Sequence, residues 1–469
     1  MGGLLNETIC AVATPLGEGG IGIVRVSGEK AVDIASGLVA LRSGRPLASA
    51  ASHVLHQAEI LDPAGADRRA RLDEALVVVM RAPRSFTGED VVELQCHGGL
   101  LILRTVCEAL VRAGARLAEP GEFTKRAFLN GRLDLAQAEA VLDTIRAKTT
   151  GSLRVAQEQL RGVLSREIDA VRETLLRLLA HVEAGIDFVE EDITFIQTPE
   201  LVNGLASARD AIGRLLAHGR EGRILREGVT AAIIGRPNVG KSSLLNALLK
   251  TDRAIVTPVP GTTRDVLEEV LNIRGIPVRL LDTAGIRDTR DPVEQEGVRR
   301  SRVAREQADL LLIVLDGSAP LTEEDLALLD NECLSADQKR LVVVNKKDLP
   351  GRLDPSVLPS AGSDCALVHI SATTGEGLDE LRDQIRALLL RPDFETREPV
   401  LVTHLRHQTA LQRAQDALTA TLASVEAKQP GELIAMDLRA AVDALGEITG
   451  AVSTDDILER IFKEFCIGK

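Results

Sequence analysis

One short segment constrains the fold of this chain more than any other. Residues 235–242 read Gly-Arg-Pro-Asn-Val-Gly-Lys-Ser and match the pattern G-x-x-x-x-G-K-[ST]. An apolar stretch at 230–234, typical of a strand, precedes the segment, and a Leu- and Ala-rich stretch, typical of a helix, follows it. A glycine-rich loop between a strand and a helix points backbone N–H groups at an anion. The segment therefore predicts a phosphate-binding loop in an α/β sheet.

The phosphate and Mg²⁺ contacts can be assigned within this pattern. We expect Lys241 to reach the β- and γ-phosphates and the Ser242 hydroxyl to bind Mg²⁺. The run Asp282-Thr283-Ala284-Gly285 follows a predicted strand at 278–281. There Asp282 is expected to hold Mg²⁺ through water, and the Gly285 amide to sense the γ-phosphate. The segment Gly261–Asp265 supplies Thr263 as the second Mg²⁺ ligand.

The nucleotide base is indicated further along the chain. Asn345-Lys346-Lys347-Asp348 follows a predicted strand at 341–344. The Asp348 carboxylate can accept hydrogen bonds from N1–H and the exocyclic amine of guanine, whereas adenine offers no such pair of donors. Ser371-Ala372, after the next strand, is placed to donate a backbone N–H to guanine O6. The nucleotide is therefore predicted to be GTP.

One expected catalytic group is missing. Ras-type proteins carry a water-positioning glutamine directly after the glycine that corresponds to Gly285, and this chain has Ile286 there. An aliphatic side chain cannot orient water, so another group must organise the attack. The loop that follows offers four acidic candidates, among which spacing alone does not choose: Asp288, Asp291, Glu294 and Glu296.

The rest of the chain indicates more than one domain. Strands at 230–234, 278–281, 310–315, 341–344 and 367–370 alternate with helices, which predicts a doubly wound parallel sheet over 223–392. Residues 1–125 mix strands at 21–26 and 75–80 with a helix at 100–113, which indicates a small α/β or α+β domain.

Two segments with helical periodicity, 126–222 and 393–469, flank the doubly wound sheet. A tail of about 70 residues buries little core by itself. We therefore expect the two segments to form one discontinuous helical domain into which the α/β domain is inserted.

Composition limits the partners. The 469 residues hold 56 Lys+Arg and 69 Asp+Glu, a net charge of −13, with 8 Phe and no Trp or Tyr. This argues against a broadly basic RNA surface and excludes Trp or Tyr stacking platforms, but not an RNA held in a local pocket or by a partner. The 6 cysteines are widely separated, which predicts reduced thiols. With no signal peptide or long apolar run in the sequence, we expect a cytoplasmic protein without membrane contact.

The motifs together resemble a known family. Residues 235–243, Gly261–Asp265 and Asp282–Gly285 resemble those of the Era-like GTPases. Four further segments resemble one branch of these proteins, the MnmE (TrmE) family of tRNA modification GTPases: residues 19–28, 86–90, 120–130 and the ending Phe-Cys-Ile-Gly-Lys at 465–469.

The resemblance implies an architecture and an activity. It implies an N-terminal folate-binding domain that forms a homodimer, a discontinuous all-α helical domain, and an inserted Ras-like P-loop GTPase domain. Members act with an FAD-dependent partner, MnmG (GidA), in a heterotetramer that shares the tRNA. They add a carboxymethylaminomethyl or aminomethyl group to carbon 5 of the wobble uridine. The one-carbon unit comes from a tetrahydrofolate derivative, in its 5,10-methylene or 5-formyl form, and K⁺ stimulates GTP hydrolysis.

The resemblance also implies site residues. Asn238 matches the K⁺-binding asparagine, with backbone groups of Thr257, Val259 and Thr262, and Glu294 matches the water-positioning glutamate. Lys241, Glu294 and Cys466 are the catalytic candidates, although the chemical role of Cys466 is not assigned. The GTP-binding positions are Asn238, Val239, Gly240, Lys241, Ser242, Ser243, Thr257, Thr262, Thr263, Asp282, Thr283, Ala284, Gly285, Asn345, Lys346, Asp348, Ser371 and Ala372.

For folate, the matching positions are Arg25, Glu93, Arg132 and Lys469. Arg132 departs from the lysine of some relatives, and the two side chains are not equivalent even though both carry a positive charge.

Two other functions were weighed against the enzyme. A regulatory switch such as a ribosome-assembly GTPase would carry a KH-type RNA-binding domain or a second G domain, and the sequence shows neither a basic G-x-x-G loop nor a second P-loop. A folate-binding module with a vestigial GTPase would not need intact phosphate, Mg²⁺ and guanine motifs. Both alternatives are therefore less favoured.

Overall fold

The computed structural model describes residues 7–62, 70–187, 199–253, 269–281, 307–329, 338–359, 362, 364–391 and 401–469. Contacts divide the chain into two compact units. The first runs to Leu142 and takes in Thr449–Lys469, and the second lies between Asp143 and Ile448. The domain boundaries at 125, 222 and 392 stay predictions.

The first unit contains a seven-stranded sheet with the order β3-β4-β5-β6-β2-β1-β7. All neighbours pair antiparallel except β1 and β7. Residues at every second position of β5, including Ala75, Val77 and Val79, are buried, as expected for a strand with one face on a core. The strands are β1 (Ile9–Val12), β2 (Gly19–Ser27), β3 (Val39–Leu41), β4 (Leu55–Leu61), β5 (Arg71–Met80), β6 (Val91–Gly98) and β7 (Arg116–Leu117).

Helices complete the first unit. Leu103, Val106 and Leu110 of α2 (Leu100–Arg112) are buried in the same cluster as β2, β5 and β6. A second cluster joins α4 (Leu135–Arg146) to α16 (Asp455–Lys463) through Leu135, Leu458 and Phe462. The chain's last helix thus packs against residues more than 300 positions earlier. The remaining helices are α1 (Ala31–Ser36) and α3 (Glu122–Leu129).

The second unit contains a six-stranded sheet with the order β13-β12-β11-β8-β10-β9. Successive residues of β11 belong to different clusters: Leu310 and Leu312 pack on one face, and Leu311 on the other. Both faces of the sheet are therefore buried, which explains the uninterrupted apolar strands. The strands are β8 (Val229–Ile234), β9 (Glu269–Ile273), β10 (Ile276–Leu280), β11 (Leu310–Asp316), β12 (Lys339–Asn345) and β13 (Cys365–His369).

The prediction of an all-parallel sheet was wrong at one edge. Strand β9 was not predicted, and it pairs antiparallel with β10. Two residues, Arg274 and Gly275, connect these strands, both with positive φ (48° and 90°). A two-residue connection can join only antiparallel neighbours, because a parallel crossover needs a dozen residues or more.

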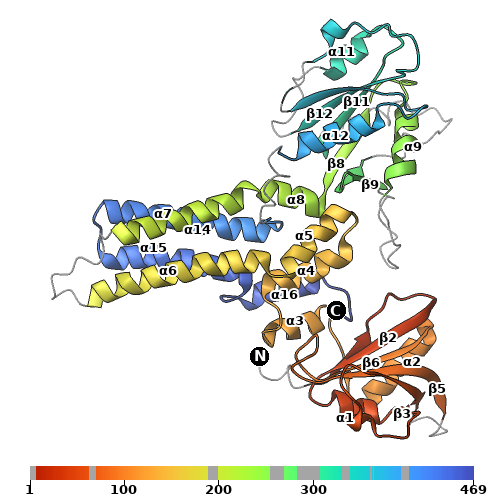
Figure 1. The fold of residues 1–469 in the computed structure, drawn as a ribbon, viewed down its shortest axis with the longest axis vertical. Coiled ribbons are helices and arrows are strands. Elements are labelled where there is room, and N and C mark those ends of the chain that lie inside the picture. The colour runs from red at the N-terminus through yellow and green to blue at the C-terminus, as the bar shows by residue number, and fades with distance from the viewer. Residues whose placement is uncertain are drawn as a thin grey trace. The chain divides into compact units, whose positions relative to one another are not determined.

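The helical segments on either side of this sheet pack together, which confirms the predicted insertion. Figure 1 shows α14 (Leu405–Glu426) lying along α7 (Pro199–Ala217). The Gln408 side chain of α14 donates a hydrogen bond to the Gly219 carbonyl at 2.7 Å. The other helices of the unit are α5 (Thr150–Leu160), α6 (Val163–Asp187), α8 (Gly219–Glu227), α9 (Lys241–Asp252), α11 (Glu323–Leu329), α12 (Leu378–Leu389) and α15 (Gly431–Thr449).

Within the described ranges, no helix is both long enough and apolar enough to cross a bilayer.

Candidate functional site

The predicted phosphate loop joins β8 to α9, and its two glycines are required by geometry. Gly235 has φ 154°, and a Cβ there would lie 2.4 Å from the Val314 carbonyl oxygen. Gly240 has φ 101°, and a Cβ there would lie 2.1 Å from Asn345 Nδ2. Both positions therefore exclude any larger residue, and Gly240 sits in the left-handed region as the N-cap of α9.

Lys241 is half-buried at the start of α9. Its ammonium donates hydrogen bonds to the carbonyl oxygens of Gly235 (2.8 Å) and Arg236 (2.7 Å). Burial lowers the pKa of Lys241 from its ordinary value. These contacts hold the cation across the loop, beside backbone N–H groups at a helix N-terminus, where an anionic phosphate is favoured.

Asn345 ties the phosphate loop to the base-reading loops. It ends β12, is 3% exposed, and donates through Nδ2 to the Val239 carbonyl oxygen at 2.9 Å. Its Oδ1 accepts a hydrogen bond from the Ala372 amide at 3.0 Å. One side chain thus links three loops at the carboxyl edge of the sheet, which is where ligands bind in open α/β sheets.

The predicted base-reading residues also lie at this edge. Lys346 has φ 66°, and its ammonium pairs with Asp316 Oδ2 at 2.6 Å. Asp348 is exposed, and Ser371 is buried with its Oγ accepting from the Thr374 amide at 3.1 Å. An exposed carboxylate beside fixed loops is available to a base.

Asp316 is a site residue that sequence reasoning missed. Its burial would raise the pKa of the carboxyl, but hydrogen bonds from Lys346 and Ser318 outweigh this and lower it. The charged carboxylate therefore orients Lys346. Its position at the end of a buried strand of the sheet was the signal that could have found it.

The structure brings together part of the predicted nucleotide site. Ser242 and Ser243 lie in the first turn of α9, and Asn238 is an exposed loop residue with φ 64°. The other predicted residues lie outside the described part of the chain: Thr257, Val259, Thr262, Thr263, Asp282, Thr283, Ala284, Gly285 and Glu294.

A second polar group lies in the first unit, at the predicted folate residues. Arg25 of β2 stands directly opposite Glu93 of β6, and the two side chains form an ion pair at 2.8 Å. The Arg25 guanidinium carbon lies 5.7 Å from the ring centroids of both Phe86 and Phe123, within the range of cation–π contacts. Arg25 is therefore held between a carboxylate and two aromatic rings.

The C-terminus joins this group. Gly468 has φ 97°, and a Cβ there would lie 2.2 Å from the Val12 carbonyl oxygen, so the chain end runs close against β1. Burial, followed by repulsion from Arg25, lowers the pKa of Lys469, while Glu93 opposes the shift. Lys469 is thus near enough to Arg25 and Glu93 to sense both charges.

The remaining predicted residues lie at the edge of this group. Arg132 is exposed, and its Nε donates to the Ser85 carbonyl oxygen at 3.1 Å, next to Phe86 in sequence. Cys466 is an exposed free thiol. Four residues predicted from separate motifs therefore gather around one loop.

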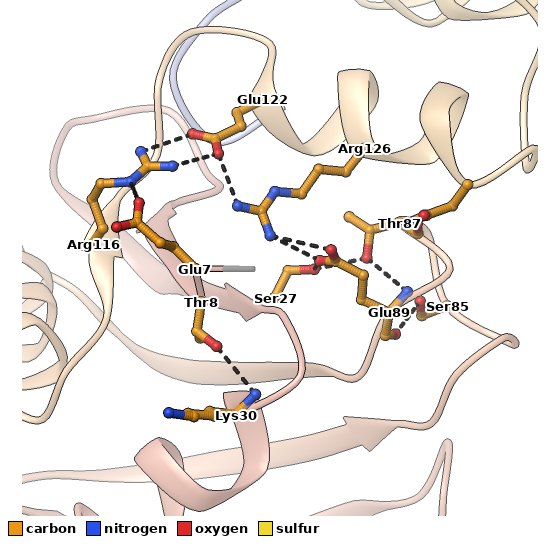
Figure 2. A network of polar contacts seen from close by, with 11 residues as sticks. Glu7, Thr8, Ser27, Lys30, Ser85, Thr87, Glu89, Arg116, Glu122 and Arg126 are labelled. Atoms are coloured by element: carbon orange, nitrogen blue, oxygen red, sulfur yellow. Dashed lines mark hydrogen bonds and ion pairs between the residues drawn. The ribbon is translucent and has the colours of Figure 1, made fainter. Parts of the chain in front are cut away.

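A buried ion network supports this region and was not predicted (Figure 2). Arg126 of α3 is 1% exposed and donates to Glu89 (3.1 Å) and to Glu122 (2.9 Å). Glu122 also receives both terminal nitrogens of Arg116, at 2.7 and 3.1 Å. Burial would raise the pKa of Glu122, but Arg116, the Glu119 amide and Arg126 outweigh this and lower it. The network joins α3 to the loop that follows Phe86.

A P-loop at the carboxyl edge of a largely parallel sheet, beside an Asn-Lys-x-Asp loop, defines a GTP-binding protein of the P-loop class. Comparison with known proteins identifies the branch. The family description "GTP-binding protein TrmE N-terminus" matches residues 8–132, and "MnmE helical domain" matches residues 135–466. The chain belongs to the MnmE family of tRNA modification GTPases.

Full-length relatives agree with this assignment. The tRNA modification GTPase MnmE of Heliobacterium modesticaldum is 51% identical over 473 residues, which cover 99% of this chain and 100% of that protein. The protein of the same name from Geobacter metallireducens is 49% identical over 469 residues, with 99% and 100% covered. The structure of Aquifex aeolicus Era bound to GDP·AlF4⁻ is 28% identical and covers 40% of this chain and 66% of its own, with a TM-score of 0.26, too low to carry an argument.

Replacing Asp348 by asparagine tests the assignment of the base. We expect the affinity for GTP to fall by about 10²-fold, because a charged acceptor for two guanine donors is lost. Affinity for XTP should rise, since its 2-oxo group accepts from the new amide. Dissociation constants for both nucleotides measure the effect. Asp354→Asn, an exposed carboxylate in the following loop, is the control. An unchanged GTP preference in Asp348→Asn would contradict the assignment.

Proposed function

We propose that this GTPase acts in the modification of the wobble uridine of certain tRNAs. Together with an FAD-dependent, MnmG/GidA-like partner, it adds a carboxymethylaminomethyl or aminomethyl group to carbon 5, using a one-carbon unit carried by tetrahydrofolate. The observation that carries the proposal is the near full-length identity of 51% to a protein named for tRNA modification. The assembled P-loop and base loops, and the Arg25 group in the first unit, are consistent with it.

The arrangement around Arg25 fits a folate. Folates combine a flat ring system with carboxylates, and the site combines two aromatic rings with the cations Arg25 and Lys469. Desolvated cations are stabilised by an anionic ligand. In this proposal Arg25, Arg132 and Lys469 hold the anionic part of the molecule, and Glu93 keeps Arg25 in place. A bound tetrahydrofolate derivative supplies the one-carbon unit.

The proposed hydrolysis site contains two cations and one carboxylate. Ser242 and Thr263 are the proposed Mg²⁺ ligands, and Glu294 is the proposed water-positioning group. Asn238, with backbone groups of Thr257, Val259 and Thr262, is proposed to bind K⁺. Positive charge beside the phosphates stabilises the charge that develops in the transition state.

Potassium dependence is a direct consequence. We expect replacement of K⁺ by Na⁺ to slow GTP hydrolysis by at least about tenfold, because the lost cation acts where an arginine finger acts in other GTPases. Phosphate release in matched chloride buffers measures the rate. Asn238→Ala should remove the difference between the two salts, whereas Asn246→Ala, at an exposed position of α9, should keep it. Equal rates of the unmodified chain in both salts would contradict the K⁺ site.

Mass spectrometry of tRNA nucleosides tests the function as a whole. A strain that lacks this protein should lose the modified wobble uridine from its tRNAs, and a plasmid copy of the gene should restore it. A copy with Lys241→Ala should not restore it if GTP hydrolysis is required. Normal modification in the strain without the protein would overturn the proposal.

The proposed assembly is a homodimer that joins the flavoprotein in a heterotetramer. This would place FAD and most of the tRNA contacts on the partner, in keeping with a chain of net charge −13 that has no Trp or Tyr. Size measurement of the chain with and without the flavoprotein tests it. A cytoplasmic location follows from the proposed tRNA substrate.

A further inference from the structure

A polar cavity in the second unit belongs to none of the sites above. It has a volume of about 460 Å³, within the range of small-molecule pockets. Its lining comes from the end of α4, from α5 and α8, from strand β10 and from the residue before α14. The lining residues that matter below are Asp143, Gln159, Arg226, Glu227, Arg279 and Thr403.

Close backbone contacts define the walls of this cavity. The Thr149 hydroxyl donates to the Gly275 carbonyl oxygen at 2.6 Å, which fixes the start of α5 on the β9–β10 turn. A Cβ at Gly151 would lie 2.4 Å from the same oxygen, and a Cβ at Gly228 would lie 2.3 Å from the Pro277 carbonyl oxygen. Helix and strand approach too closely here for any side chain to intervene. The cavity is therefore bounded by fixed backbone.

Gln159 presents a fixed acceptor to the cavity. Its side chain is 3% exposed, and Nε2 donates to the Leu401 carbonyl oxygen (3.1 Å) and to Thr403 Oγ1 (2.9 Å). A carbonyl oxygen can only accept, so the amide cannot be flipped and Oε1 is the remaining acceptor. Gln159 Oε1 is buried and receives no hydrogen bond from the part of the chain that the structure describes. Buried acceptors of this kind are rare and costly.

Arg279 of β10 presents a donor to the same space. Its Nε is buried and has no hydrogen-bond partner within the described residues. The carboxylates of the wall are already engaged. Asp143 accepts from Arg226 Nε and contacts His404 Nε2, both at 2.8 Å, and Glu227 pairs with Arg226 at 2.9 Å. The cavity therefore presents a cation and an acceptor that the protein itself does not pair.

We propose that this cavity binds a small organic anion that also carries a hydrogen-bond donor. The anionic group pairs with Arg279, and a hydroxyl of the ligand donates to Gln159 Oε1. Phosphate esters and carboxylates of small polyols share this chemistry. The proposal is independent of the tRNA function, because it uses neither the P-loop nor the Arg25 group.

Calorimetric titration of the full-length chain tests this site. Saturating Mg²⁺ and GDP block the P-loop, and glycerol 3-phosphate and glycerate are titrated separately to distinguish a phosphate from a carboxylate. We expect saturable binding of one molecule per chain for at least one of them. Arg279→Gln should weaken that binding about tenfold or more. Arg274→Gln, on the same hairpin but paired with the exposed Asp379 and Asp383, should change it less than twofold.

Hydrogen exchange of the unsubstituted chain provides a second measurement that does not depend on the folding of a variant. The bound anion should slow exchange in peptides from α5 and β10. Three results would each overturn the proposal: no binding of either anion, equal binding by the Arg279→Gln chain, or binding without protection of α5 and β10.

Discussion

Replacing Lys241 by alanine is expected to lower kcat for GTP hydrolysis by about 10²- to 10³-fold, the scale of removing one preorganised charge from a transition-state site. The ammonium is half-buried and lies across the phosphate loop, bonded to two of its carbonyl oxygens. Its pKa is lowered only because burial disfavours its charge, and a bound phosphate would reverse that penalty. Single-turnover measurement of GDP formation separates this effect from weaker binding.

The matched control for this variant is Lys250→Ala. Lys250 lies on the same helix, α9, but is exposed in its last turn and away from the loop. Its loss should leave kcat within about twofold, since exposed charges contribute little. If Lys241→Ala hydrolyses GTP as fast as Lys250→Ala does, the phosphate site has been placed wrongly.

Replacing Arg126 by methionine is expected to destabilise the first unit by about 3–5 kcal/mol, because two buried carboxylates lose their partner. Arg126 is 1% exposed and pairs with both Glu89 and Glu122. The chain has no Trp or Tyr to report unfolding by fluorescence. Hydrogen exchange in β2 and β6 peptides measures the local stability instead.

Two further variants separate lost charge from lost packing. Arg104→Met removes an equivalent but exposed pair with Glu108 and should cost less than about 0.5 kcal/mol. Adding Glu89→Gln and Glu122→Gln to Arg126→Met should recover much of the loss, because no buried charge is then unpaired. A stable Arg126→Met chain would show that Glu89 and Glu122 do not depend on Arg126.

The success of prediction depended on how local the information was. Residues 235–242 announce a loop, its ligand and its flanking elements within one stretch of chain, and the structure places β8 and α9 as expected. Strand β9 was missed because it is a five-residue edge strand whose identity depends on pairing with β10. Short segments of this kind have weak intrinsic preference, and their neighbours decide them.

The sequence by itself determined the chemistry of the nucleotide site. Gly235, Gly240, Lys241 and the Asn345–Asp348 run are contiguous motifs whose spacing already implies a phosphate and a guanine. Only the tertiary structure decided the rest: Asn345 as a link between loops, Arg25 between Phe86 and Phe123, and Arg279 beside Gln159. The physical reason is that a motif records which groups are available locally. Burial, pairing and unpaired charge arise only where distant segments meet.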